Sequence, residues 1–228
     1  MAKFVFFIVG LLIGCGIGWL AGSLSSTFTT VSNDPNSGRF LAPPETRWSG
    51  DGRDMVLLKD FVFIDSRGKS WLAEKDTIVN GASIPRMLWT MTGGPLTGRF
   101  RNASIVHDAE CERMTSPSTD VHRMFYDACR AGGVEERDAK YLYWAVANYG
   151  PTWQTRSVST VAATAPPVGA GLKSTPPNTT TIRLDARQPT EKELEWAEEY
   201  FKQENPSIDK VPLLTPPDDN QPAVNHGV

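Results

Sequence analysis

Three predicted helices joined by very short connections constrain the fold of this chain more than any other feature. They span residues 99–114, 119–131 and 135–148, and each ends at a proline or glycine stop signal. The connections have only about four to five residues, so successive helices must pack antiparallel or nearly so. In the second helix, apolar residues recur with helical spacing and predict its core-facing side: Val121, Met124, Phe125 and Ala128.

A β-hairpin is expected before the helices. Residues 55–64 and 69–73 are apolar and rich in β-forming residues, and the four-residue segment 65–68 between them suits a hairpin turn. A chain of 228 residues has room for one domain of ordinary size plus extensions. We therefore expect an α+β domain over residues 55–155, in which a small N-terminal hairpin or sheet packs on a three-helix core.

The regions flanking this domain have the composition of linkers. Residues 25–54 are rich in Ser, Thr, Asn, Pro and Gly, and residues 156–189 are rich in Pro, Thr and Ala, so both are expected to be linkers. A capping-box pattern then starts an amphipathic helix over residues 190–205, and residues 206–228 are expected to form a disordered tail. The narrow apolar stripe of this helix suits docking either on the domain or on a protein partner.

The N-terminal segment 4–24 contains no charged residue, and about 20 apolar residues suffice to span a bilayer. Lys3 precedes it and no Lys or Arg follows until Arg39, so the positive-inside rule predicts a cytoplasmic N-terminus and a periplasmic or other extracytoplasmic domain. We rank a single uncleaved transmembrane anchor first and a signal peptide cleaved near residues 21–23 second. A lipoprotein acylated at Cys15 ranks third, because the sequence after this cysteine stays apolar.

Glycines recur every fourth residue in the predicted span, at Gly10, Gly14, Gly18 and Gly22. This spacing places them on one stripe of a helix, as in the small-xxx-small packing of membrane dimers, and so predicts self-association. The alternative is that glycine is simply frequent in membrane helices. The net charge of −3 is small and spread along the chain, so electrostatics favours no nucleic-acid partner.

The candidate site lies on the first two helices of the domain. His107 and His122 are the only histidines outside the C-terminal tail. If the two helices are antiparallel, residues whose numbers sum to roughly 233 face each other, so His107 faces Tyr126 and Cys111 faces His122. The two histidines are then offset by about one turn, near enough to share a water or a metal ion. The same register puts Cys129 about 10 Å along the helix from Cys111, which disfavours a disulfide.

A paired imidazole and carboxylate is the commonest means of moving protons near neutral pH. We therefore expect His107 to act as general base and Asp108 as a ligand or orienting group, with His122 and Tyr126 completing a catalytic pocket. The structural alternatives are a core histidine at 107 bonded to Tyr126, and a polar rim residue at 122. Ser83 is interpreted as the N-cap of a short helix rather than as a nucleophile.

Three motifs support a resemblance to a known family. They are Gly-Ala-Ser-Ile-Pro-Arg at 81–86, His-Asp at 107–108, and Arg-x-Phe at 123–125 followed by Ala-Gly-Gly-Val. This arrangement resembles an uncharacterised phage and bacterial family, number 1353 among the domains of unknown function, over about residues 55–153. That family carries no established activity to transfer. Asn80 stands where we expect an Asp in this family.

The His-Asp pair also resembles secreted phospholipases and their viral and bacterial relatives. In those enzymes the His activates water, the adjacent Asp and the carbonyls of a glycine-rich loop hold calcium, and an Asp on the antiparallel helix orients the His. The resemblance implies His107 as base and calcium ligands at Asp108, Gly94 and Gly98, which are of the oxygen type that calcium takes. The expected orienting Asp is replaced by His122, so a nitrogen ligand for zinc is the alternative.

Two functions follow from these observations. The first is a membrane-anchored phage or bacterial envelope protein that hydrolyses an envelope ester with metal assistance, through the His107 and Asp108 site. The second is a non-enzymatic membrane-associated protein of phage or envelope assembly, in which the glycine stripe drives association and the helix at 190–205 binds a partner.

Overall fold

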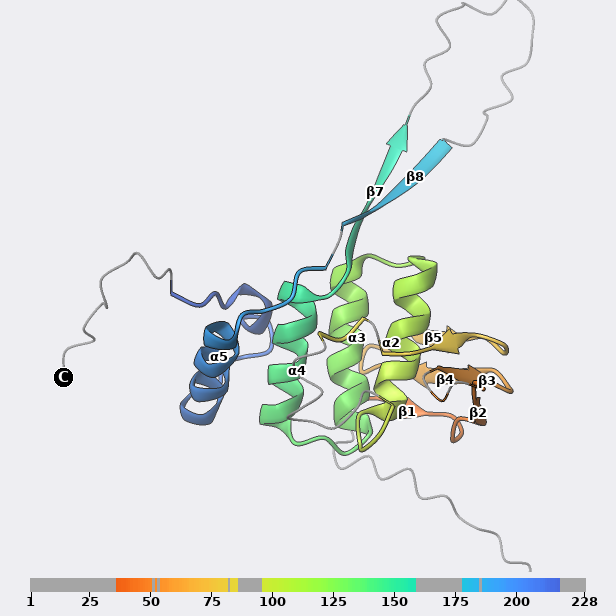
Figure 1. Cartoon of the computed structure of the whole chain (residues 1–228), viewed down its shortest axis with the longest axis horizontal. Coiled ribbons are helices and arrows are strands. Elements are labelled where there is room, and N and C mark those ends of the chain that lie inside the picture. Colours follow the sequence, from red (N-terminus) through yellow and green to blue (C-terminus); the bar gives the residue numbers. More distant parts are fainter. Residues whose placement is uncertain are drawn as a thin grey trace, which may run out of the picture.

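A computed structural model describes residues 36–217, except residues 51, 53, 82, 86–95, 159–177 and 185. These residues form an α+β fold built from small antiparallel sheets and helices, as expected (Figure 1). Within the described ranges, no helix is both long enough and apolar enough to cross a membrane. The predicted anchor at residues 4–24 and its glycine stripe lie outside these ranges and stay predictions.

Two three-stranded antiparallel sheets open the domain. The first has the order β1-β4-β5 and the second the order β2-β3-β6. Their strands are β1 (Arg39–Phe40), β2 (Thr46–Trp48), β3 (Met55–Leu57), β4 (Phe61–Ile64), β5 (Ser70–Ala73) and β6 (Ile78–Val79). The β4–β5 hairpin confirms the predicted turn at 65–68, and its register pairs Ile64 with Ser70. Its inward side chains are buried because they alternate along each strand: Phe61, Phe63, Trp71 and Ala73.

The expected linker at 25–54 contains two of these strands, β1 and β2. Each strand has only two or three residues, too few to produce a recognisable alternation of apolar and polar residues. They form because β1 pairs with β4 and β2 pairs with β3. Gly38 allows β1 to approach, since its φ of 92° is unfavourable for other residues and a Cβ there would collide with the Ile64 carbonyl.

The three predicted helices are present and lie side by side (Figure 1). They are α2 (Arg101–Arg113), α3 (Ser118–Ala131) and α4 (Glu136–Tyr149), each within about two residues of its predicted bounds. The strands pack on α2 and α3, through contacts of β4, β5 and β6 with α2 and of β1 with α3. The core between sheets and helices contains Trp71, Phe61, Phe63, Ile105, Met124 and Phe125, all at most 2 % exposed.

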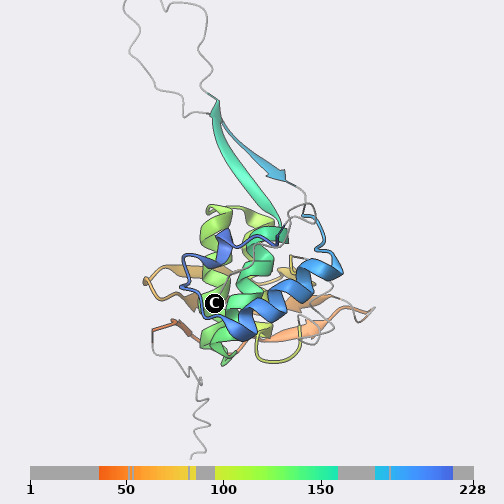
Figure 2. The ribbon, with the colours of Figure 1, turned by 90° about the vertical axis from the view of Figure 1, so that its left-hand side faces the viewer.

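The expected linker at 156–189 contains the end of one strand and the whole of another. β7 (Thr152–Val158) and β8 (Asn178–Leu184) pair antiparallel from Thr152 with Leu184 to Val158 with Asn178. Figures 1 and 2 show this pair as an arm that projects away from the helices. The Thr-rich composition of β8 suits a strand as well as a linker, because threonine is β-branched.

The C-terminal helix α5 (Glu191–Gln203) packs on α4 and buries its apolar stripe at Leu194, Ala197 and Phe201. The predicted capping box is present between Thr190 and Glu193. Beyond α5, the expected disordered tail at 206–228 is wrong for residues up to 217. They include the short helix η2 (Val211–Leu213), with Val211 fully buried. The core accepts this segment because its apolar side chains fill the space beside α4, as the η2 contacts with α4 show.

Candidate functional site

Four side chains from three parts of the chain form one connected polar cluster in the core. Helix α2 supplies His107 and Asp108, helix α3 supplies His122, and the loop after β6 supplies Ser83. Each has at most 8 % of its surface exposed, and His107 has none. Because buried polar groups need hydrogen-bond partners, the contacts among these four side chains determine what the cluster can do. We call the series Ser83, His107 and His122 the Ser83–His122 chain.

The Ser83–His122 chain is continuous from the hydroxyl to the second imidazole. Ser83 Oγ lies 2.9 Å from His107 Nδ1, and His107 Nε2 lies 3.0 Å from His122 Nδ1. The Phe125 ring packs against the His107 ring with centroids 4.7 Å apart. His107 is therefore held from both ring nitrogens and from one face, so its orientation is fixed. The prediction that His107 and His122 come together is confirmed.

Asp108 joins the chain at the serine. One carboxylate oxygen, Oδ1, accepts a short hydrogen bond from the Ser83 hydroxyl. The other, Oδ2, accepts the backbone N–H groups of Gly81 at 2.5 Å and Asn80 at 3.2 Å. Gly81 has a φ of 72°, a conformation that glycine adopts without strain and that turns successive N–H groups toward an anion. The loop after β6 is thus fastened to α2 through this carboxylate.

Burial keeps both histidines neutral near pH 7. It lowers the pKa of His107 well below 6.5, with a further contribution from His122. Burial also lowers the pKa of His122 to about 4, although the nearby Pro151 carbonyl opposes this. For Asp108, burial raises the pKa, and hydrogen bonds from Ser83, Gly81 and Asn80 partly offset the rise. A neutral imidazole has one donor and one acceptor nitrogen, so both histidines can pass a proton along the chain.

The other predicted site residues take different places. Tyr126 lies near Tyr143 of α4, with ring centroids 6.1 Å apart, and Phe125 rather than Tyr126 packs on His107. The predicted facing of His107 and Tyr126 is therefore replaced by a facing one position earlier on α3. Gly98 has a φ of 71°, whereas Gly94 lies outside the described residues.

Both described cysteines carry free thiols, as the predicted register requires. Cys111 Sγ lies 3.8 Å from each ring nitrogen of His107, and burial raises its pKa well above 9.0. It is therefore a neutral, weakly polar neighbour of the histidine. In the part of the chain that the structure describes, no three His, Cys, Asp or Glu side chains are grouped to hold a metal ion.

The sequence interpretation did not place Ser83 in this polar cluster. Its hydroxyl contacts His107 and Asp108, whereas it was expected to be the N-cap of a short helix. The available signal was the Asn-Gly turn directly before it, because glycine at such a turn permits close approach of backbone to another group. The partner helix could not be identified from the sequence, since more than 20 residues separate Ser83 from His107.

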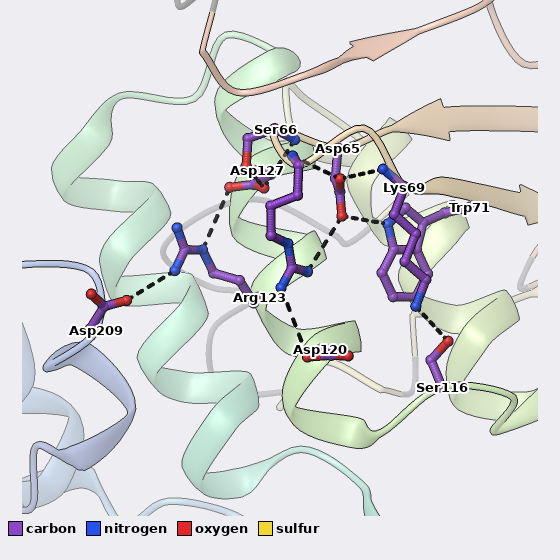
Figure 3. A network of polar contacts seen from close by, with 10 residues as sticks. Asp65, Ser66, Lys69, Trp71, Ser116, Asp120, Arg123, Asp127 and Asp209 are labelled. Atoms are coloured by element: carbon purple, nitrogen blue, oxygen red, sulfur yellow. Dashed lines mark hydrogen bonds and ion pairs between the residues drawn. The ribbon is translucent and has the colours of Figure 1, made fainter.

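A second polar network fixes helix α3, which carries His122. Asp127 Oδ2 accepts hydrogen bonds from the Ser66 hydroxyl at 2.6 Å and from its backbone N–H at 3.3 Å. Arg123 lies between Asp127, at 3.7 Å, and Asp209 of the C-terminal segment, at 3.2 Å (Figure 3). The turn of the β4–β5 hairpin, α3 and the C-terminal segment are therefore linked by charged groups.

Asp65 organises the hairpin turn beside this network. Its side chain accepts the Trp71 indole N–H at 2.9 Å and the backbone N–H groups of Lys69 and Arg67 (Figure 3). Burial alone would raise the pKa of Asp65, but the bonds from Trp71, Lys69 and Arg67 outweigh it and lower the pKa. Lys69 in turn donates to Ser116 Oγ at 2.8 Å, in the connection between α2 and α3. The connection is thereby held against the hairpin.

Comparisons with known proteins find relatives that are themselves uncharacterised. Two relatives from Sinorhizobium fredii are similar to the chain: Uncharacterized protein y4jT is 36 % identical over 184 residues, which is 78 % of this chain and 52 % of the relative. Uncharacterized protein y4iH is 38 % identical over 104 residues, 46 % of this chain and 44 % of the relative. The chain spans about half the length of these curated relatives.

No solved structure matches the chain at a significant level. One family model does match, over residues 55–146, which contain β3 to β6 and nearly all of α2 to α4. The matched segment includes the Ser83–His122 chain and the Asp108 carboxylate. The matching model is that of DUF1353, a family described as protein of unknown function, and it is the family that the sequence motifs resemble.

Proposed function

We propose that this chain is a hydrolase that cleaves an ester, with Ser83 as nucleophile, His107 as general base and His122 as the group that orients the base. The observation that carries the proposal is the 2.9 Å contact between Ser83 Oγ and His107 Nδ1. The other ring nitrogen of His107 is held by His122 at 3.0 Å. A nucleophile, a base and an orienting group in hydrogen-bonded series are the usual arrangement for covalent catalysis by serine.

The proposed reaction uses these atoms in order. Ser83 Oγ attacks the carbonyl carbon of the ester while its proton passes to His107 Nδ1, and this proton then goes to the leaving alcohol. Water, deprotonated by His107, hydrolyses the acyl-Ser83 ester and restores the hydroxyl. The lowered pKa of His107 keeps its imidazole neutral at the start. Once His107 is charged, its Nε2–H donates to His122 Nδ1, which stabilises the imidazolium.

Accessibility is consistent with a nucleophilic serine. Ser83 keeps 6 % of its surface exposed, whereas His107 is completely buried. Direct activation of water by His107, as in the phospholipase resemblance, would require water to replace Ser83 at Nδ1 or His122 at Nε2.

The contacts of Asp108 favour a serine mechanism over the metal-assisted one expected from the sequence. Both of its carboxylate oxygens already accept hydrogen bonds, from Ser83 on one side and from Gly81 and Asn80 on the other. A calcium ion at Asp108 would have to displace these donors. We therefore assign Asp108 to holding the serine loop rather than to binding calcium or zinc.

We further propose that the ester belongs to the cell envelope, because residues 4–24 have the composition of a membrane anchor. Carbonate extraction of membranes from cells that express the full chain tests this point. The full chain should stay with the membrane fraction, and a variant lacking residues 1–24 should be released. Release of the full chain would refute the anchor and leave the catalytic proposal intact.

Covalent labelling tests the catalytic proposal. A fluorophosphonate probe should label the full chain, and p-nitrophenyl butyrate should be hydrolysed. Ser83→Ala should abolish both signals, and His107→Gln should lower both by at least about a hundredfold, the usual contribution of a general base. Ser104→Ala is the matched control. Ser104 is a buried serine like Ser83, but it lies on α2 and its hydroxyl donates to the Phe100 carbonyl of the same helix. Equal labelling of Ser83→Ala, or no labelling of the unmodified chain, would refute the proposal.

The second candidate, a non-enzymatic assembly protein, is favoured by the β7–β8 arm. This arm projects from the helices (Figure 2), and Ile182 and Leu184 on it are 48 % and 46 % exposed. Replacing both residues with Ser should leave fluorophosphonate labelling unchanged and, under this candidate, should reduce the assembly state measured by sedimentation. An unchanged sedimentation coefficient would remove the support that the arm gives to it.

A further inference from the structure

We propose that Asp108 is a positioning residue that sets which nitrogens of His107 and His122 carry protons, and that it thereby holds Ser83 in a resting arrangement. The catalytic consequence rests on the proposed function above, whereas the proton arrangement does not. The proposal follows from counting donors and acceptors along contacts that are already described. No group outside the Ser83–His122 chain and Asp108 with its hydrogen-bond donors is needed.

The count starts at the carboxylate. An ionised carboxylate can only accept hydrogen bonds, and four donors converge on Asp108: the Ser83 hydroxyl and the backbone N–H groups of Asn80, Gly81 and Ser83. Such convergence favours the ionised form. A serine hydroxyl has one proton, and here that proton points to Asp108. Toward His107, therefore, Ser83 Oγ can only accept.

The remaining protons are then fixed in turn. His107 must carry its proton on Nδ1 to donate to Ser83 Oγ, so His107 Nε2 is an acceptor. His122 must carry its proton on Nδ1 to donate to that nitrogen. Its own Nε2 is left without a proton. This atom is buried and makes no hydrogen bond of good geometry within the described residues.

The resting arrangement has two consequences. His107 Nδ1 already carries a proton and cannot accept one from Ser83, so His107 cannot act as the general base in this arrangement. At the far end, His122 Nε2 carries no proton and stays a buried acceptor without a donor among the described residues.

Adding one proton at Asp108 reverses every bond. A neutral Asp108 donates to Ser83 Oγ, the Ser83 hydroxyl donates to His107 Nδ1, and His107 Nε2–H donates to His122 Nδ1. His122 then carries its proton on Nε2. The two arrangements differ by this single proton, and no heavy atom has to move. Only the second arrangement presents the serine proton to the base.

Asp108→Asn imitates the neutral carboxyl without changing its shape. The amide oxygen can still accept from Asn80 and Gly81, and the amide nitrogen can donate to Ser83 Oγ. We therefore expect His107 and His122 both to carry their protons on Nδ1 in the unmodified chain and on Nε2 in Asp108→Asn. Nitrogen-15 NMR of the histidine-labelled full chain reads the tautomers directly, with His107→Gln and His122→Gln to assign the signals.

A matched control separates this effect from general perturbation of the core. Asp127→Asn replaces another buried carboxylate that accepts from a serine hydroxyl, that of Ser66 in the β4–β5 turn, and it lies about 140° around α3 from His122. It should leave both tautomers unchanged. If Asp108→Asn fails to fold, Ser83→Ala gives the same test, because without the hydroxyl the carboxylate can no longer fix the His107 proton on Nδ1. Unchanged tautomers in the folded variant would overturn the proposal.

Labelling with the fluorophosphonate probe tests the catalytic consequence. Asp108→Asn should react faster than the unmodified chain by about tenfold, the order expected for release of a hydroxyl from a charged acceptor. Slower labelling would overturn the resting-state role of Asp108 even if the tautomers switch. A tautomer switch with no labelling of either protein would refute the proposed function and uphold the proton arrangement. Labelling of both proteins with no tautomer switch would uphold the proposed function and refute the proton arrangement.

Discussion

Acid should destabilise this domain through His122, and the size of the effect follows from the burial of its ring. The folded chain holds the pKa of His122 at about 4, against 6.5 as the ordinary value, and only 2 % of the residue is exposed. Below pH 6.5 His122 binds a proton in the unfolded chain but not in the folded chain. The contribution is therefore fully present above pH 6.5 and is lost as the pH falls toward 4.

The loss amounts to about 3 kcal/mol, at about 1.4 kcal/mol for each pH unit between the two pKa values. His107 acts in the same direction, because burial lowers its pKa as well. Urea unfolding of the full chain at several pH values between about 7.5 and 4.5 gives the free energy of unfolding. His122→Gln should be less stable than the unmodified chain at neutral pH, and this difference should shrink by about 3 kcal/mol toward pH 4.

Asp76→Asn is the control for general acid effects. Its side chain is 76 % exposed, and asparagine tolerates the left-handed backbone at this position, where φ is 66°. This variant should follow the unmodified chain at every pH. If the curves of His122→Gln and the unmodified chain run parallel, His122 does not resist protonation in the folded state, and the argument for a dry, neutral histidine pair is wrong.

Three further changes test the supports of the site. Thr190→Ala should cost about 1 kcal/mol in urea unfolding, because it removes the side-chain half of the capping box with Glu193. Trp71→Phe should cost about 1–3 kcal/mol, since buried Asp65 loses a donor, and NMR titration should show a raised Asp65 pKa. Gly38→Ala should lower the free energy of unfolding by more than about 1 kcal/mol, because its φ of 92° is unfavourable for alanine and a Cβ would collide with the Ile64 carbonyl. An unchanged free energy of unfolding in any of these three variants would contradict the cause given for it.

The sequence predicts the elements whose signals are local. Helices α2 to α5 follow from periodicity, caps and stop signals, and the β4–β5 hairpin follows from two apolar runs around a turn. Strands β1 and β6 have two residues each and exist because distant strands offer them free backbone groups. No local pattern encodes that kind of pairing, and the same holds for β8, whose partner β7 lies about 20 residues earlier.

The sequence predicted how far along the helix axes the site residues lie, but not the direction in which they point around each helix. Counting residues from the turn placed His107 and His122 within one turn of each other, and they are in contact. It could not fix the rotation of α3, where one residue corresponds to about 100°, so Phe125 and not Tyr126 packs on His107. Ser83 was beyond such reasoning, because its position depends on how the loop after β6 crosses α2.

The C-terminal segment completes the core of this domain late in synthesis, because it covers α4 and is translated last. The Trp144 indole N–H donates to the Leu214 carbonyl at 3.0 Å, and Val211 is fully buried beside α4. The matched family segment ends at residue 146, so a nascent chain of that length exposes an unfinished apolar face on α4. Domains fold as units once their parts have emerged. The apolar cover of α4 is therefore completed only after some 70 further residues have been translated, and a truncated product should be recognised by chaperones and proteases as unfinished.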